Sequence, residues 1–195
     1  MKKLKGLVVI LMTLSGAIGY GASAQAHSTH PTAGTCTSGT TTTLDNDHGA
    51  INSDYNNYKG SWTYESGSTK APNSYNGDHR YIVAPTPTYS VYEWQLTDCG
   101  SLYGTFSVYI SHSKFYHPNV NYRSTSWGSN GDGSYSPTQV LNTYLDQETA
   151  KGGWNTIGKS NQKKTGHLEL FVFSSSSSGV GGVGADAARV YKSSY

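Results

Sequence analysis

The stretch from Ser124 to Pro137 combines aromatic, amide and carboxylate side chains in a Gly-rich context. Trp127 and Tyr135 stand on either side of an Asn-Gly-Asp-Gly sequence, which is typical of an irregular polar loop. Sugars bind proteins by stacking their apolar C–H faces on aromatic rings, while polar side chains complete the hydrogen bonds. We expect Trp127 and Tyr135 to act as stacking platforms, with Asn130 and Asp132 as hydrogen-bond partners.

The overall composition favours the same chemistry. The chain has 16 Tyr and 4 Trp against 4 Phe, and only 13% of its residues are charged. A surface that is polar through Ser, Thr, Asn and Tyr suits a neutral ligand. The composition therefore suits an extracellular protein, and the many Tyr, Trp, Asn, Ser and Thr side chains are of the kinds that bind polysaccharides.

Two groups of residues could bind a metal ion. His27 would become the N-terminal residue after cleavage at Ala26, and an N-terminal His can bind copper through its amine and ring nitrogen. Copper-dependent polysaccharide monooxygenases use that arrangement. Asp45, Asn46 and Asp47 could hold a structural calcium together with backbone carbonyls, although three such residues in a row lack the spacing of a calcium loop. We expect no other cofactor.

Catalytic signatures are otherwise sparse. The sequence contains no Gly-x-Ser-x-Gly and no His-Glu-x-x-His motif. Pairs drawn from Glu93, Asp146, Glu148 and Glu169 could serve glycoside hydrolysis, which needs two carboxylates facing one cleft. A chain of this length offers such pairs without any catalytic role, so we expect a protein that is not an enzyme.

The first 26 residues have the pattern of a secretory signal peptide. Three lysines precede an apolar stretch from Gly6 to Ile18, and Ala24-Gln25-Ala26 forms a small-x-small cleavage site. Its removal takes away three of the 14 basic residues and none of the 12 acidic ones, which leaves 11 basic residues against 12 acidic residues. A nearly neutral chain has no basic stripe for nucleic acid. We expect a secreted protein with no membrane anchor after cleavage.

Cys36 and Cys99 are the two cysteines of the chain. In an exported protein such a pair typically forms a disulfide. We expect it to tie the N-terminal stretch to the middle of the domain.

Short strands separated by turns dominate the rest of the chain. Residues 27–43 are rich in Thr, Ser and Gly and are expected to form a linker, with one domain over residues 44–195. Period-two alternation is clearest over Tyr89–Leu96, Thr105–Ser111 and Leu168–Val172. This pattern with Gly-rich turns predicts an all-β, antiparallel β-sandwich. Ser174–Gly184 is expected to be a flexible hairpin loop or connection outside the core.

Several short motifs follow one another in a fixed order. They are Leu44-Asp45-Asn46, Gly60-Ser61-Trp62, Tyr75-Asn76-Gly77, Tyr92-Glu93-Trp94, Phe106-Ser107-Val108, Gly152-Gly153-Trp154 and Ala185-Asp186-Ala187. Their order resembles the domain shared by golvesin-like proteins and xanthan lyases, from about Leu44 to Tyr191. The resemblance implies a jelly-roll, galactose-binding-like sandwich of carbohydrate-binding type without catalytic residues. The stretches 124–137 and 174–184 depart from the family pattern, so a relative's ligand is not carried over.

Five residues of these motifs and their surroundings are expected to be structural. Trp62, Trp94 and Trp154 match core positions of the family. Gln147 is interpreted as a buried amide bridging strands. Asp186 lies between alanines in an expected buried strand, where it would accept hydrogen bonds from loop amides or pair with Arg189.

The sequence therefore favours a secreted, non-catalytic polysaccharide-binding domain. Two further functions stay open: a structural cell-surface or matrix protein without a small ligand, and a copper polysaccharide monooxygenase built on His27.

Overall fold

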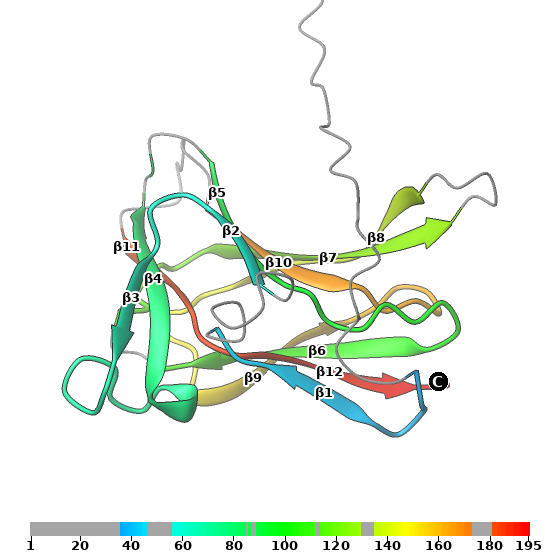
Figure 1. Ribbon diagram of the computed structural model, residues 1–195, viewed down its shortest axis with the longest axis horizontal. Helices are drawn as coiled ribbons and strands as arrows, with labels where there is room; N and C mark the ends of the chain where they lie inside the picture. The colour runs from blue at the N-terminus through cyan, green and yellow to red at the C-terminus, as the bar shows by residue number, and fades with distance from the viewer. Residues whose placement is uncertain are drawn as a thin grey trace, which may run out of the picture. The chain divides into compact units, whose positions relative to one another are not determined.

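The computed structural model describes residues 36–46, 56–84, 86, 89–111, 114–129, 135–172 and 181–195, and within them the regular secondary structure is almost entirely β-strand (Figure 1). Among the described residues there is one 3-10 turn, η1 (Tyr75–Gly77), which precedes β4. The strands are β1 (Thr41–Leu44), β2 (Asn56–Lys59), β3 (Thr63–Ser66), β4 (Asp78–Ala84), β5 (Ser90–Trp94), β6 (Tyr103–Ile110), β7 (Val120–Ser129), β8 (Tyr135–Leu145), β9 (Gly153–Lys159), β10 (His167–Val172), β11 (Gly181–Ala185) and β12 (Ala188–Ser193).

The strands form three antiparallel sheets. A four-stranded sheet has the order β1-β12-β6-β9, a five-stranded sheet the order β2-β5-β10-β7-β8, and a three-stranded sheet the order β11-β4-β3. The first two form opposing layers, and the third lies at one end of them (Figure 1). The expected all-β antiparallel sandwich is confirmed, and the small third sheet adds to it an element that alternation alone did not predict.

One hydrophobic core lies between the layers. Phe106, Val108 and Ile110 alternate along β6 and are buried, and Leu168 and Leu170 do the same on β10. Successive side chains of a strand point to opposite faces, so each strand of this kind buries one row and presents the other outward. The expected alternation on these two strands is confirmed.

The stretch from Ser124 to Pro137, expected to be a long loop, is mostly a hairpin. β7 runs to Ser129, and β8 begins at Tyr135. The two strands pair from Val120↔Leu145 to Ser129↔Tyr135, with a register shift between Ser124 and Thr125. The loop prediction was wrong here because small polar residues such as Ser and Thr are compatible with strands when cross-strand backbone bonds are available.

The end of the Ser174–Gly184 stretch was also misread. Gly181–Ala185 forms strand β11, whose residues are all buried and pair with β4. A Cβ on Gly184 would overlap the ring of Phe115, and one on Gly182 would overlap the backbone oxygen of Lys114. The glycines are therefore not a sign of flexibility: they leave space for another segment to pack directly on the strand.

The start of the domain lies slightly before the expected boundary. β1 begins at Thr41 and pairs with β12 from Thr41↔Tyr191 to Leu44↔Ala188. The last residues of the expected linker are thus an edge strand of the four-stranded sheet. The expected signal peptide, Met1–Ala26, lies outside the described residues.

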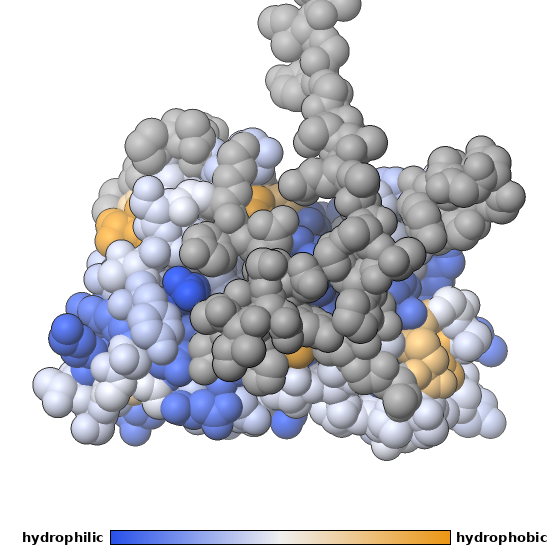
Figure 2. Space-filling view, in the orientation of Figure 1, coloured by the Kyte–Doolittle hydropathy of each residue, from blue (hydrophilic) through white to orange (hydrophobic). Residues whose placement is uncertain are grey.

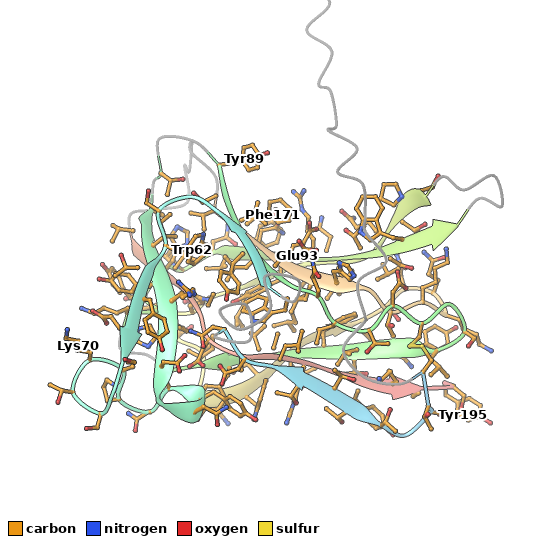
Figure 3. All side chains as sticks on the ribbon, in the orientation of Figure 1. Trp62, Lys70, Tyr89, Glu93, Phe171 and Tyr195 are labelled. Carbon is orange, nitrogen blue, oxygen red and sulfur yellow. A yellow bond between two sulfur atoms is a disulfide. The ribbon has the colours of Figure 1, made fainter. Side chains whose placement is uncertain are left out.

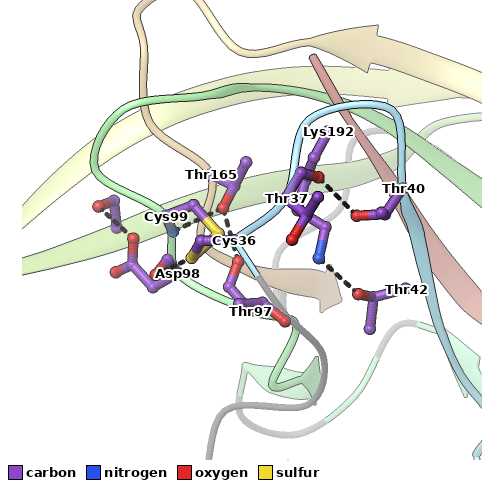
Figure 4. The surroundings of a disulfide bond; sticks show 10 residues. Cys36, Thr37, Thr40, Thr42, Thr97, Asp98, Cys99, Thr165 and Lys192 are labelled. Atoms are coloured by element: carbon purple, nitrogen blue, oxygen red, sulfur yellow. Dashed lines mark hydrogen bonds between the residues drawn. A yellow bond between two sulfur atoms is a disulfide. The ribbon is translucent and has the colours of Figure 1, made fainter. Parts of the chain in front are cut away.

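The disulfide between Cys36 and Cys99 is present, with Cα atoms 5.5 Å apart (Figure 4). Beside it, the hydroxyl of Thr165 accepts from the backbone N–H of Cys99 at 2.8 Å and donates to the carbonyl of Thr97 at 2.6 Å. The bridge joins the segment before β1 to the connection between β5 and β6. Nowhere in the described part of the chain does a helix reach the length and apolar character needed to span a membrane.

Candidate functional site

The outer face of the five-stranded sheet, which points away from the four-stranded sheet, carries rings and polar groups together. Its members are Glu93 on β5, Glu169 and Phe171 on β10, Arg123 and Trp127 on β7, and Tyr144 on β8. Figure 3 shows Glu93 and Phe171 on this outer side. The alternate residues of the same strands, such as Tyr92 and Leu170, are buried in the core. We call this surface the outer face.

The centre of the outer face is a row of polar side chains across three strands. Glu93 and Glu169 are direct cross-strand partners, and Glu169 pairs on its other side with Arg123. The Nδ1–H of His167 donates to Oε1 of Glu93 at 2.8 Å, and the hydroxyl of Thr125 donates to Oε2 of Glu169 at 3.2 Å. Like charges directly opposite on neighbouring strands destabilise a sheet, so the glutamate pair is a cost to the fold when both carboxyl groups are ionised.

The pKa of Glu169 is raised to about 7, mainly by burial of its carboxyl group. The neighbouring Glu93 carboxylate adds to the increase, while Thr125, His167 and Arg123 act in the opposite direction. A glutamate ordinarily titrates near pH 4.3. The charge of this polar row therefore changes close to neutral pH. Ionisable groups with strongly shifted pKa values are concentrated at functional sites.

Rings and amides flank this row on the β10–β7–β8 side. The guanidinium carbon of Arg123 lies 4.4 Å from the ring centroid of Phe171, and its Nε–H donates to Oδ1 of Asn121 at 2.8 Å. The amide of Asn121 donates in turn to Oδ1 of Asn142 at 2.8 Å. On the edge strand β8, Tyr144 is 58% exposed. The arrangement offers apolar ring surface beside amide, guanidinium and carboxylate groups.

Trp127 is the one expected sugar-binding side chain that the structure describes. It is half-buried, and alternation along β7 places it on the outer face. The carboxylate of Asp98 fixes this end of β7: Oδ2 accepts from the backbone N–H of Trp127 at 2.6 Å and Oδ1 from the hydroxyl of Ser126 at 2.8 Å. Tyr135 is the first residue of β8, but its side chain lies outside the described part, as do Asn130 and Asp132.

The three tryptophans expected in the core differ in burial. Trp94 is 1% exposed and Trp62 is 8% exposed. Trp154 is only half-buried: its ring lies edge-on to Tyr75 and Tyr109, with centroids 5.4 Å and 5.3 Å away. The core assignment of Trp154 was therefore wrong, because its strand, β9, is an edge strand on which no residue is fully buried.

Gln147 is a fully buried amide at the junction of three segments. Its Nε2 donates to the hydroxyl of Tyr122 at 2.7 Å and to the carbonyl of Gly184 at 2.9 Å. Its Oε1 accepts from the backbone N–H of Gly184 at 2.9 Å. The side chain thus continues the hydrogen bonding of the edge strand β11, which has only β4 as a strand partner among the described strands.

Asp186 is 1% exposed and accepts from a loop amide, the first of the two partners expected for it. Its two carboxylate oxygens lie 3.1 Å from the backbone nitrogen of Tyr75. Its pKa is raised to about 9, first by burial and further by Asp45 and Asp78. The second expected partner, Arg189, has its guanidinium carbon 4.3 Å from the ring centroid of Trp154.

The candidate metal ligands are only partly described. Asp45 and Asn46 are buried at the end of β1, while Asp47 and His27 lie outside the described residues. The carboxylate of Asp45 accepts from the backbone N–H of Asn46 at 2.8 Å and from the side-chain amide of Asn76 at 2.6 Å. Across the described ranges, no three His, Cys, Asp or Glu side chains are grouped closely enough to hold a metal ion.

A second surface feature is a depression of about 400 Å³ beside β3, lined by residues 64–70. The surface over β3 and the loop after it is largely hydrophilic in Figure 2, and Lys70 projects there in Figure 3. Tyr64 is the only ring in this lining, with the guanidinium carbon of Arg80 5.0 Å from its centroid. The outer face offers more ring surface and is the stronger candidate for a ligand site.

No protein-family model matches the chain, and no curated protein matches it. Several solved structures are similar in part. One is the catalytic domain of a GH87 α-1,3-glucanase variant in complex with tetrasaccharides, with 11% identity, a TM-score of 0.40, and coverage of 81% of this chain and 28% of that one. Another is a carbohydrate-binding module of the β-sandwich superfamily, with 12% identity, a TM-score of 0.33, and coverage of 80% of this chain and 56% of that one. A third is CBM28, a module specific for non-crystalline cellulose, with 11% identity, a TM-score of 0.34, and coverage of 73% of this chain and 86% of that one.

The chain spans less than two thirds of the length of the first two of these structures. TM-scores of this size assign neither a family nor a ligand to this chain. The resemblance to golvesin-like domains stays a prediction from the sequence.

Sequence reasoning identified Glu93 and Glu169 only as two of several carboxylates, and it missed Phe171, Arg123 and Tyr144 as members of one surface. A signal was available on β10. Glu169 and Phe171 alternate with Leu168 and Leu170, which predicts one face for the first pair and the core for the second. The order of the strands, which brings β5, β7 and β8 beside them, was not readable from that alternation.

Proposed function

We propose that this chain is a non-catalytic, golvesin-type module that binds an extracellular polysaccharide through the outer face of its five-stranded sheet. The observation that carries the proposal is the combination of exposed ring surface on Tyr144 with Phe171 and Trp127 on the same face. Aromatic rings stack on the C–H faces of sugars, and the surrounding amide and charged groups bond their hydroxyls. The disulfide is in keeping with an extracellular site of action.

The test is binding of the chain without Met1–Ala26 to a panel of polysaccharides, followed by calorimetry on those that bind. Phe171→Ala or Tyr144→Ala should weaken binding about ten- to hundredfold, since a stacking ring contributes on the order of 1–3 kcal/mol. Tyr191→Ala is a matched control, because Tyr191 is 45% exposed on β12 of the other layer. Equal losses in all three variants would contradict the assignment to this face.

Glycoside hydrolysis is a second candidate, favoured by the direct pairing of Glu93 with Glu169. Retaining glycosidases use two carboxyl groups about 5–5.5 Å apart, one of them protonated near neutral pH. The protonation of Glu169 would suit the acid, and Glu93 would be the nucleophile. Release of reducing ends from a bound polysaccharide that is abolished in Glu169→Gln would show that the chain is an enzyme and not a binding module. Binding without release supports the binding module.

A structural protein and a copper enzyme would each give a different result in these experiments. A chain that binds no polysaccharide in the panel would be a structural surface or matrix protein. Nanomolar copper(II) binding that disappears in His27→Ala would favour the monooxygenase.

A further inference from the structure

The four-stranded sheet, which is the layer opposite the five-stranded sheet, carries basic side chains and no acidic ones (Figure 1). None of its four described strands, β1, β6, β9 and β12, contains an Asp or a Glu. On its solvent side, Arg189 of β12 alternates with the buried Val190, and Lys159 of β9 is exposed. The full chain has 14 Lys and Arg against 12 Asp and Glu, so its acidic residues are concentrated elsewhere.

Both basic side chains are held by aromatic rings. The guanidinium carbon of Arg189 lies 4.3 Å from the ring centroid of Trp154, and Nζ of Lys159 lies 4.6 Å from that of Tyr103. Within the described part of the chain, neither side chain makes a hydrogen bond or an ion pair with another protein group. Asp186, the acidic residue nearest to Arg189 in the sequence, accepts instead from a backbone N–H of η1. Each cation is therefore positioned by a ring while its N–H donors stay available for an anionic group.

The two cation–ring pairs lie towards opposite ends of β6. Trp154 is the cross-strand partner of Tyr109, whereas Tyr103 is the first residue of the strand. At the rise of an extended strand these two positions on β6 are about 20 Å apart. Between them, the hydroxyls of Ser107 and Thr156 lie 3.4 Å from each other. A ligand that contacts both cations must therefore be extended, and hydroxyl groups lie along its path.

We propose that this side of the four-stranded sheet, the cationic face, is a second binding surface that takes an extended anionic polysaccharide. Carboxylate or sulfate groups of the sugar chain bind Arg189 and Lys159, and the hydroxyls between these residues bond those of the sugars. A guanidinium donates two parallel hydrogen bonds to one such group, and charge-assisted bonds are about twice as strong as neutral ones. Two cations are fewer than the clusters of Lys and Arg that bind nucleic acids or anionic membranes.

The cationic face goes beyond the proposed function, because it differs from the outer face in position and in charge. On the outer face, Arg123 is the cross-strand partner of Glu169, and its Nε–H already donates to Asn121. An anionic sugar would meet the carboxyl group of Glu169 there, and it meets no carboxyl group on the strands of the cationic face. One module thus has separate surfaces for uncharged and anionic glycans.

The test compares two hexasaccharides that differ only in charge: α-1,4-linked galacturonate and its methyl ester. Calorimetry at neutral pH in low salt should give about tenfold or more tighter binding of galacturonate by the wild type, and added salt should reduce this preference. Arg189→Gln and Lys159→Gln should each remove most of it. Lys70→Gln is the matched control, because it removes the same charge from an exposed position in the loop after β3. Dextran sulfate against dextran makes the same comparison for sulfate groups.

Three results would overturn the second surface. One is equal affinity for the charged and uncharged ligands in both comparisons, and another is a preference that survives both glutamine variants or falls equally in Lys70→Gln. The third is displacement of galacturonate by an uncharged polysaccharide that binds the wild type, since both ligands would then share one site. Binding of galacturonate without any uncharged polysaccharide would instead overturn the proposed function alone. Thermal melting of each variant identifies any loss that arises from unfolding.

Discussion

Both carboxylate oxygens of Asp186 lie 3.1 Å from the backbone nitrogen of Tyr75, 111 residues earlier in the chain. This contact ties the link between β11 and β12 to the 3-10 turn before β4. The Nε1–H of Trp94 donates to the backbone oxygen of the same Asp186 at 3.3 Å. One buried residue thus joins elements of all three sheets.

Asp186 should make the protein less stable as the pH rises. Its pKa is about 9 in the folded state, against about 3.9 in an unfolded chain. Between these values the folded state holds a proton that the unfolded state has lost, so the free energy of unfolding falls with increasing pH, by up to about 1.4 kcal/mol per pH unit. Asp186→Asn should remove this contribution, and its stability relative to wild type should increase from pH 5 to pH 8.

Urea unfolding at several pH values measures this difference. Asp146→Asn is the control, because the pKa of Asp146 is lowered by hydrogen bonds from Thr149 and its own effect falls in the acid range. Parallel pH profiles for wild type and Asp186→Asn would show that Asp186 is ionised in the folded protein.

Replacing Gln147 with Met should destabilise the fold by about 3 kcal/mol or more. Met has a similar volume but leaves the N–H and carbonyl of Gly184 and the hydroxyl of Tyr122 without their partner. Each buried polar group left unsatisfied costs about 1–3 kcal/mol. Denaturant unfolding measures the loss, with the exposed Gln139→Met as control. A loss below about 1 kcal/mol would mean that water or a rearrangement satisfies these groups.

The tryptophans should separate stability from binding. Trp94→Ala should cost about 3–5 kcal/mol, since Trp94 is 1% exposed in the core. Trp154→Ala should cost less, because Trp154 is half-buried on an edge strand. Trp127→Ala should weaken polysaccharide binding about ten- to hundredfold with little change in melting temperature. Melting curves on the three variants check that the loss of stability is largest for Trp94→Ala and smallest for Trp127→Ala, and calorimetry measures the loss of polysaccharide binding. An unfolded Trp127→Ala variant would contradict this prediction.

Loss of the disulfide should lower the free energy of unfolding by about 4 kcal/mol. Cys36 and Cys99 are 63 residues apart, and the chain-entropy model gives this value for a loop of that size. Unfolding of Cys36→Ser/Cys99→Ser against the oxidised wild type measures the difference. Thiol titration of denatured, unreduced wild type should find no free thiol, and two free thiols would refute the bridge.

The sequence determined those features that depend on local pattern. Alternation of Phe106, Val108 and Ile110 predicted a strand and its buried face, because a strand's side chains alternate whatever lies beside it. Cys36 and Cys99 predicted their bridge because no other cysteine was present. These inferences needed no knowledge of strand order.

Only the tertiary structure decided which segments pair and which side chains meet. Gly181–Ala185 has the composition of a flexible connection, but β4 and the segment around Phe115 make it a buried strand. Trp154 resembles a core residue by motif, yet the edge position of β9 leaves it half-buried. Glu93 and Glu169 are far apart in the sequence, and they form a pair because β10 inserts between β5 and β7, a consequence of long-range backbone pairing that no local pattern encodes.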